Sequence, residues 1–170
     1  SRFCTNRKLL GEGGESIERF CAQGLTELGD KLGPILWQFM GTKQFDHDDF
    51  GAFLKLLPKA QDGVKLSHAV EPRHESFRTP EFVEMARAEG VAIVFADADD
   101  YPCIADVSGD FVYARLQRTR ADVSTGYDKA ALDRWAAVAK EWAGGKSPGG
   151  FAYAAAPAPE RPRETFVFVI

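Results

Sequence analysis

Cysteine, histidine and methionine are scarce in this sequence, with three Cys, three His and two Met among 170 residues. Cys4, Cys21 and Cys103 are an odd number and lack the C-x-x-C spacing, which indicates neither a disulfide framework nor a zinc knuckle. The H-x-H and H-E-x-x-H patterns of zinc enzymes are also missing. We therefore predict no metal site and no cofactor.

Long apolar runs are missing as well. No stretch approaches the roughly 18 to 20 apolar residues that cross a bilayer, and the start lacks the pattern of a signal peptide. We predict a cytoplasmic protein that does not bind membranes. The net charge of -4 and the pI near 5.4 argue against broad binding to nucleic acids, although Arg115, Arg118 and Arg120 leave a local basic rim open as an alternative.

The sequence does contain enough apolar residues for one sizeable core. It is 45% hydrophobic and 27% charged, which is typical of a single globular domain, here residues 1–170. Ser1 is not a starting methionine, and the apolar run at residues 165–170 stops without a turn or a polar tail. We expect both ends to be cuts through a larger fold.

Apolar runs with strand character alternate with segments of helical periodicity. The runs predict strands at residues 35–40, 64–71, 91–95, 111–116 and 165–170. Steps of three and four between apolar residues predict helices between them, at about 15–31, 46–57, 79–90 and 128–142. Because these strands are apolar on both faces and are joined by helices, we predict an α/β fold with a parallel sheet.

Two architectures fit this alternation: an open doubly wound sheet and a closed (β/α)8 barrel. The glycine-rich segment at residues 11–14 precedes a helix but follows no strand, so the fingerprint of a dinucleotide-binding turn is missing. This absence favours the barrel. Five strands cannot close a barrel of eight strands, which typically needs about 250 residues, so we expect the first strands to lie outside this chain.

A cluster of charge follows the strand predicted at residues 64–71. Glu71, Arg73 and His74 place a carboxylate, a guanidinium and an imidazole within four residues. Such groups are costly to bury unless they pair with each other or with a ligand. Other polar residues fall at or near the ends of the predicted strands, where the loops of a parallel barrel converge on a site: Gln38, Asp97, Tyr113, Arg115 and Gln117.

Strand alternation places Glu71 and Arg73 on one face, with His74 on the other, and groups Tyr113 with Arg115 and Gln117. Two guanidiniums at one rim suit a carboxylate or a phosphate. We interpret Glu71 as a residue that holds an arginine or acts as a base, and His74 as a group that moves a proton. The alternative is a purely structural ion pair.

The acids after the strand predicted at residues 91–95 admit a second interpretation. Asp97, Asp99 and Asp100 could hold a hard cation such as Mg²⁺. Capping of loops and turns explains most of them better, and only Asp97 falls at a strand end. We assign Asp97 to substrate binding rather than to a metal.

Three motifs in the same order resemble the YecE-like family of uncharacterised proteins (domain of unknown function 72). They are LGPILWQF at residues 32–39, VEPRHESF at 70–77 and FVYARL at 111–116, followed by Tyr127 and Trp135. The resemblance covers roughly residues 1–142. It implies a TIM-barrel fold without an established activity, and that this chain holds strands four to eight.

The sequence departs from the family pattern in three places. Pro72 stands where members usually carry an aromatic or aliphatic residue, and Gln117 with Arg118 replaces a His-Gly pair. The asparagine-rich segment that members carry after the last strand would begin beyond Ile170. Because Gln117 and Arg118 replace the His-Gly pair, the site that the resemblance implies lacks a histidine.

Two hypotheses follow. The first is a hydrolase or related enzyme that acts on a small anionic compound, with phosphorylated compounds included. Arg73 and Arg115 would bind the anion, Glu71 and His74 would be the catalytic acid and base, and Gln38 and Tyr113 would position the substrate; we also assign Gln117 and Asp97 to substrate binding. The second is a binding or scaffold protein whose charges are structural, since a fold alone does not fix a function.

Overall fold

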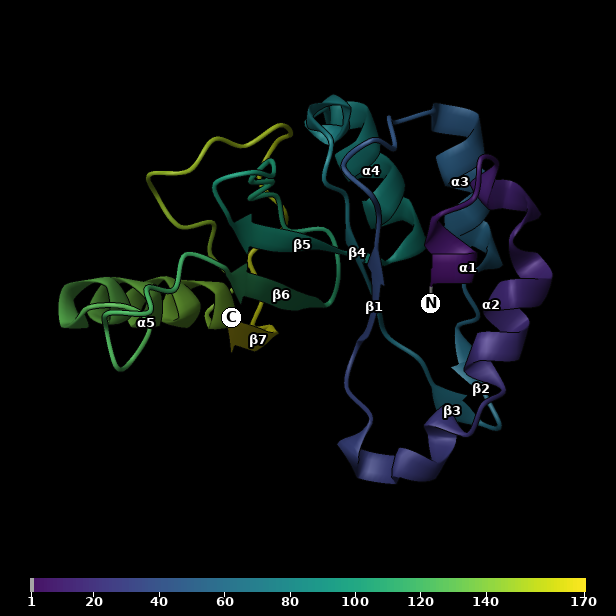
Figure 1. Cartoon of the computed structure of the whole chain (residues 1–170), viewed down its shortest axis with the longest axis horizontal. Coiled ribbons are helices and arrows are strands. Elements are labelled where there is room, and N and C mark those ends of the chain that lie inside the picture. The colour runs from purple at the N-terminus through teal and green to yellow at the C-terminus, as the bar shows by residue number, and fades with distance from the viewer. Residues whose placement is uncertain (1) are drawn as a thin grey trace.

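The structure, a computed structural model, describes residues 2–170 (Figure 1). Helices and parallel strands alternate along most of the chain. In order, the elements are α1 (Arg2–Thr5), the 3-10 helix η1 (Leu10–Glu12), α2 (Gly14–Cys21), the 3-10 helix η2 (Leu25–Lys31), β1 (Ile35–Gln38), α3 (His47–Leu56), β2 (Ala60–Gln61), β3 (Val64–Lys65), β4 (His68–Glu71), the 3-10 helix η3 (Glu75–Phe77), α4 (Pro80–Glu89), β5 (Ala92–Asp97), β6 (Phe111–Leu116), α5 (Lys129–Ala143) and β7 (Glu164–Val169).

The central element is a five-stranded sheet with the strand order β1-β4-β5-β6-β7. Every neighbouring pair in this sheet is parallel, which confirms the α/β class predicted from the alternation. In Figure 1, β1 and β4 lie in the middle with α4 above them, α2 and α3 lie on the right, and β5, β6, β7 and α5 lie on the left. The carboxyl ends of all five strands therefore lie at one edge of the sheet.

The helices pack against one face of the sheet. Trp37 of β1 and Val70 of β4 are aligned in register and belong to the apolar cluster that α3 and α4 complete with Phe53 and Phe82. On β5 and β6 the same face is covered by α5, whose Trp135, Val138 and Trp142 form a second cluster. Burial of these aromatic side chains is the main apolar contribution to the fold.

The opposite face of the sheet carries a smaller apolar cluster and, closer to the carboxyl ends of the strands, polar and charged side chains. Alternation turns Leu36, Ala69 and Tyr113 to this side, where they pack in one group that also includes Phe166 of β7. Two residues further along, the same alternation turns Gln38, Glu71 and Arg115 to that face. The site described below is built on this second layer.

Side-chain caps begin the three longer helices where the sequence indicates. The carboxylate of Asp46 accepts from Asp49 N at 2.8 Å, the hydroxyl of Thr79 from Phe82 N at 3.3 Å and the carboxylate of Asp128 from Ala131 N at 2.8 Å. Each cap satisfies an amide that the first helical turn leaves without a partner. Gly90 ends α4 with a φ of 68°, a conformation that glycine adopts without strain.

The strand predicted at residues 64–71 is wrong in its first half. Residues 64 and 65 form β3, which pairs antiparallel with β2, and only His68–Glu71 belongs to the central sheet. The two-residue turn Asp62-Gly63, with φ values of 50° and 77°, is typical of a type I′ hairpin and joins β2 to β3. The strand predicted at residues 111–116 matches β6 at both ends, whereas three others shift: β1 stops at Gln38, β5 is Ala92–Asp97 and β7 is Glu164–Val169.

The long helix predicted at residues 15–31 is also wrong. The structure has α2 up to Cys21 and then the 3-10 helix η2 from Leu25. Gly24, at a φ of 84°, breaks the helix between them, and Gly29 kinks η2 with a φ of 53°. Both backbone conformations are left-handed and end a regular α-helix.

The sheet is open among the described residues. β1 and β7 each pair with one neighbour, so a closed barrel is not seen. Val167, Phe168 and Val169 of the edge strand β7 are exposed, at 38 to 51% of their surface. No helix in the described part of the chain is long and apolar enough to cross a membrane.

Candidate functional site

Glu71 is the centre of the charge cluster. It is the last residue of β4, and only 1% of its surface is exposed. Its Oε1 accepts a hydrogen bond from Arg73 Nε at 3.0 Å, and its Oε2 accepts from Gln38 Nε2 at 3.1 Å and from Arg115 Nη1. Three donors, two of them cationic, therefore compensate the burial of this carboxylate.

The sheet register brings these partners together. Gln38 ends β1 and is aligned with Glu71 across the β1–β4 pair. Arg73 follows two residues after Glu71, and Arg115 reaches the same carboxylate from β6, two strands away. The structure thus brings together Gln38, Glu71, Arg73 and Arg115, four of the polar residues that the sequence places at or near strand ends.

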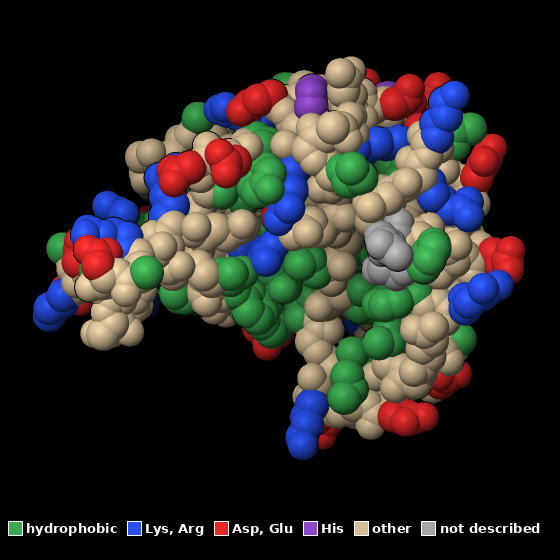
Figure 2. Space-filling view, viewed as in Figure 1, with side chains coloured by type: hydrophobic (Ala, Val, Ile, Leu, Met, Phe, Trp, Pro, Cys, Tyr) green, Lys and Arg blue, Asp and Glu red, His purple; other side chains and the backbone are tan. Residues whose placement is uncertain are grey.

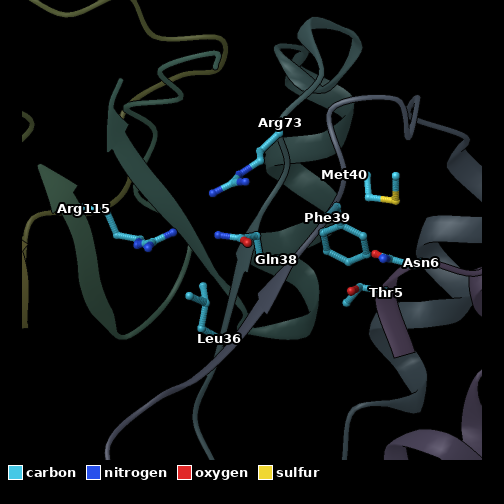
Figure 3. Close-up of a pocket in the computed structure, with 8 residues that line it drawn as sticks. All are labelled: Thr5, Asn6, Leu36, Gln38, Phe39, Met40, Arg73 and Arg115. Atoms are coloured by element: carbon cyan, nitrogen blue, oxygen red, sulfur yellow. The ribbon is translucent and has the colours of Figure 1, made fainter. Parts of the chain in front are cut away.

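A cavity of about 480 Å³ lies beside the cluster. Arg73, Arg115 and Gln38 line one part of it, and their side chains point toward one another in Figure 3. The remaining lining residues are Thr5, Asn6, Leu36, Phe39 and Met40. In the space-filling view, basic side chains lie next to apolar ones in the hollowed middle of this face (Figure 2). The volume falls in the range of small-molecule sites, roughly 300 to 1,000 Å³.

The two guanidiniums retain N–H groups beyond those that bind Glu71. Arg115 uses Nη1 for Glu71, and its Nε and Nη2 make no hydrogen bond to any described residue. Arg73 uses Nε for Glu71 and Nη1 for the hydroxyl of Tyr101 at 3.4 Å, and its Nη2 has no such bond within residues 2–170. Because both side chains line the cavity, these donors are available to a ligand.

Tyr101 is a residue that the site assignment missed. It lies in the loop after β5, and its ring packs against the Arg73 guanidinium with the Cζ 4.2 Å from the ring centroid. This is a cation–π contact, which holds the guanidinium plane in place. The signal available in the sequence was its position just after a strand end, four residues beyond Asp97.

The polar residues at the other end of the cavity were also missed. Thr5 belongs to α1 and Asn6 follows it, while Phe39 and Met40 follow β1 directly. No strand is predicted near Thr5 and Asn6, so no pattern in the sequence places them at a site. Phe39 and Met40 were instead assigned to the interior of the strand predicted at 35–40.

His74 does not line the cavity. Its Nδ1 accepts from Ser76 N at 3.1 Å and lies 2.9 Å from the Ser76 hydroxyl, so it caps η3. Alternation had placed His74 on the opposite face from Glu71, and the structure keeps the two groups in separate roles. The predicted acid and base are therefore not brought together at the cavity.

Tyr113 and Gln117 lie on the same side of the sheet as Arg115 by strand alternation, but they do not line the cavity either. Tyr113 is buried and stacks on Phe168, with ring centroids 4.8 Å apart. Burial raises the pKa of the Tyr113 phenol, while the Arg115 charge lowers it and the Glu71 charge raises it. The side-chain amide nitrogen of Gln117 is buried and has no hydrogen-bond partner among the described residues.

Asp97 belongs to a second cluster, at the end of β5. Its Oδ2 accepts from the Tyr127 hydroxyl at 3.1 Å, and its Oδ1 lies 3.3 Å from Arg118 Nη1. Arg118 also binds Asp99 at 2.9 Å and the carbonyl of Ala98 at 3.0 Å. Asp97 is thus separate from the Glu71 cluster. Within residues 2–170, no group of three or more His, Cys, Asp or Glu side chains is arranged to hold a metal ion.

Comparison with known proteins gives a family. The family described as protein of unknown function DUF72 matches this sequence over residues 1–161. The chain belongs to the DUF72 family. This confirms the resemblance to the YecE-like family noted from the motifs at residues 32–39, 70–77 and 111–116. No curated protein matches the chain.

Two solved DUF72 structures share the fold. The chain is similar to a DUF72 protein of Thermotoga maritima, with 20% identity, a TM-score of 0.66 and coverage of 92% of this chain and 58% of that one. It is also similar to a DUF72 protein of Enterococcus faecalis, with 15% identity, a TM-score of 0.60 and the same coverage of each chain. The chain therefore spans somewhat more than half the length of these two DUF72 proteins.

Proposed function

We propose that this DUF72 chain binds a small anion in the cavity beside Glu71. The observation that carries the proposal is the set of unused guanidinium N–H groups of Arg73 and Arg115 at the cavity wall. Guanidiniums that are held by a buried carboxylate are already oriented, so little conformational entropy is lost when an anion binds.

In this proposal Glu71 orients the two arginines rather than acting as a base. Its two oxygens already accept three hydrogen bonds, and it is almost fully buried. Gln38 holds the carboxylate from the side of β1. His74, Tyr113, Gln117 and Asp97 have no role in it, because their side chains do not line the cavity. The proposal therefore covers binding and assigns no reaction.

The second candidate is a structural network. The nearly complete use of the Glu71 oxygens favours it, since a buried ion pair can serve only to satisfy its own members. The two candidates differ in one observable. If the network is only structural, added anions do not change the stability of the protein. If the cavity binds anions, they raise it.

We further propose that the five strands are part of a (β/α)8 barrel and that residues 1–170 form one incomplete domain of it. Support comes from the parallel order β1-β4-β5-β6-β7, from the helices on one face and from the open edges of β1 and β7. Further strands would then pair between β7 and β1.

A thermal-shift titration with acetate, phosphate and sulfate tests the binding proposal. Ionic strength is kept constant with chloride, so that only specific binding raises the melting temperature. We expect at least one anion to stabilise the wild type and not Arg115→Ala. Arg118→Ala is the matched control, because Arg118 is engaged by Asp97 and Asp99 away from the cavity. If none of the three anions stabilises the wild type, the structural network is the correct reading.

A further inference from the structure

The two arginines offer different sets of donors to the cavity. In a guanidinium, Nε and Nη2 form one planar fork that matches two oxygens of one anion. Arg115 binds Glu71 through Nη1, which leaves this fork without a partner among the described residues. Arg73 donates from Nε to Glu71 and from Nη1 to the Tyr101 hydroxyl. Only its Nη2 makes no hydrogen bond within residues 2–170.

Tyr101 restricts Arg73 further. Its ring lies 4.2 Å from the Arg73 Cζ and covers one face of the guanidinium. A flat ligand cannot stack on that face, because the face is already in contact with an aromatic ring. Because its Nε and Nη1 are already bonded, Arg73 offers an anion the single donor Nη2 beside the complete fork of Arg115.

The charge of the cluster limits the charge of the ligand. Two guanidiniums and one carboxylate leave a net charge of one positive unit at the cavity wall. The remaining lining residues, Thr5, Asn6, Leu36, Gln38, Phe39 and Met40, are uncharged. A monoanion neutralises this site, whereas a dianion leaves an uncompensated negative charge beside the buried Glu71.

The rest of the wall describes the body of the ligand. Leu36, Phe39 and Met40 give the cavity an apolar side, and Thr5 and Asn6 add polar groups away from the arginines (Figure 3). An apolar chain that extends from the anionic group would cover Leu36 and the exposed Met40 and displace water from them. Inorganic anions would leave that surface hydrated.

From these four features we infer that the site is selective for monocarboxylates with an apolar body over phosphate-type dianions. The inference rests on the proposed function and narrows its ligand class. The carboxylate oxygens pair with Nε and Nη2 of Arg115, and Arg73 Nη2 donates to one of them. Tyr101 is a positioning residue, because it acts through the orientation of Arg73.

Three probes with six carbon atoms each test the selectivity: hexanoate, hexanesulfonate and hexylphosphonate, at a pH where the phosphonate carries two charges. Their affinities for the chain are measured by isothermal titration calorimetry at constant ionic strength. We expect hexanoate to bind about tenfold more tightly than hexylphosphonate, which corresponds to the difference that one charge-assisted hydrogen bond makes. Hexanesulfonate, a tetrahedral monoanion, should fall between them, because it keeps the charge match but not the planar geometry.

The outcomes separate the two proposals. If hexylphosphonate binds as tightly as hexanoate or more tightly, in a manner that Arg115→Ala abolishes, the selectivity is wrong and the anion site stands. If none of the three probes binds, both the selectivity and the site are wrong. If binding is unchanged in Arg115→Ala, the probes bind elsewhere and the assignment of the site is wrong.

Two variants test the geometry rather than the presence of charge. Arg115→Lys keeps the positive charge but removes the fork, so the preference for hexanoate over hexylphosphonate should fall toward equality. Tyr101→Leu uncovers the face of Arg73 and releases its Nη1, and hexylphosphonate should gain affinity relative to hexanoate. If the ratio of the hexanoate and hexylphosphonate affinities is the same in both variants as in the wild type, the inference is wrong. Residues with a purely structural role would leave this ratio unchanged.

Discussion

Two charge clusters lie at the same edge of the sheet and differ in what they leave unpaired. In the Glu71 cluster the carboxylate is buried, and the two arginines around it line a cavity and keep N–H groups that bind no described residue. In the Asp97 cluster, Arg118 binds two carboxylates and a backbone carbonyl, and half of its side-chain surface is exposed. In the sequence both clusters show the same pattern, charged residues at or just after the end of an apolar strand.

The comparison shows why position at a strand end is not sufficient for a site. Asp97 is satisfied by the Tyr127 hydroxyl and Arg118, and its cluster contributes no residue to the cavity. In the Asp97 cluster one arginine binds two carboxylates, whereas in the Glu71 cluster one carboxylate binds two arginines. Surplus donors beside a cavity, rather than charge alone, identify the candidate site.

Removal of the central carboxylate should separate the two clusters most strongly. Glu71→Ala should lower the free energy of unfolding by about 3 to 5 kcal/mol, because two guanidiniums are left without their buried partner. Asp97→Ala should cost only about 1 kcal/mol, since Arg118 keeps Asp99 and is half exposed. Urea denaturation of both variants measures the difference. Equal losses would mean that the clusters are energetically equivalent.

Replacement of one arginine in each cluster should separate them by function. Arg115→Met should weaken the binding of hexanoate by about tenfold or more, because it removes the fork. Arg118→Met should leave the affinity unchanged, since Arg118 does not line the cavity. Calorimetric titration of both variants with hexanoate gives the two affinities. A similar loss in Arg118→Met would show that the effect is long-range and not a property of the cavity.

A comparison of two tyrosines sharpens the distinction between structural and positioning contacts. Tyr127→Phe should lower stability by about 1 kcal/mol, because the buried hydroxyl accepts from Arg118 N at 2.8 Å and donates to Asp97. Tyr101→Phe keeps the ring over Arg73 and should change stability by less than about 0.5 kcal/mol. Thermal unfolding of the two variants provides the values, and a reversed order would assign Tyr101 to the structural class.

The smallest expected effect is on the titration of Tyr113. Its pKa is raised above 10.0 by burial, and Arg115 opposes this increase. Arg115→Met should therefore raise the Tyr113 pKa further and leave Tyr127 unchanged, as seen in the pH dependence of the tyrosine ring-carbon NMR signals. Because the folded-state pKa is raised, the stability that Tyr113 contributes is present below pH 10.0 and is lost as the pH rises through the folded value. A fall in the Tyr113 pKa would contradict the proposed effect of the Arg115 charge on the phenol.

Local patterns predicted the parts of the site that depend on one strand or on neighbouring strand ends. Alternation placed Glu71 and Arg73 on one face, and both bind each other in the structure. The caps at Asp46 and Thr79 were likewise evident from residue type and spacing. These features need only the period of a strand or the first turn of a helix.

The remaining features depend on how the loops fold over the sheet edge. Tyr101 reaches Arg73 from the loop after β5, and Thr5 at the end of α1 and the following Asn6 reach the cavity. No periodicity in the sequence encodes these contacts. His74 illustrates the opposite case, because its chemistry suggested catalysis while its neighbour Ser76 made it a local cap. The Asp62-Gly63 turn was readable in the sequence and was overlooked.

The most direct test of the account is an NMR titration of the arginine Nε–H signals with hexanoate. Arg115 Nε has no partner among the described residues, whereas Arg73 Nε binds Glu71 and Arg118 Nε binds Asp99. We expect a saturable shift of the Arg115 Nε signal that exceeds the shifts of Arg73 and Arg118. An Arg115 signal that does not move, or that moves no more than that of Arg118, would contradict the claim that the Glu71 cluster holds open donors for an anion.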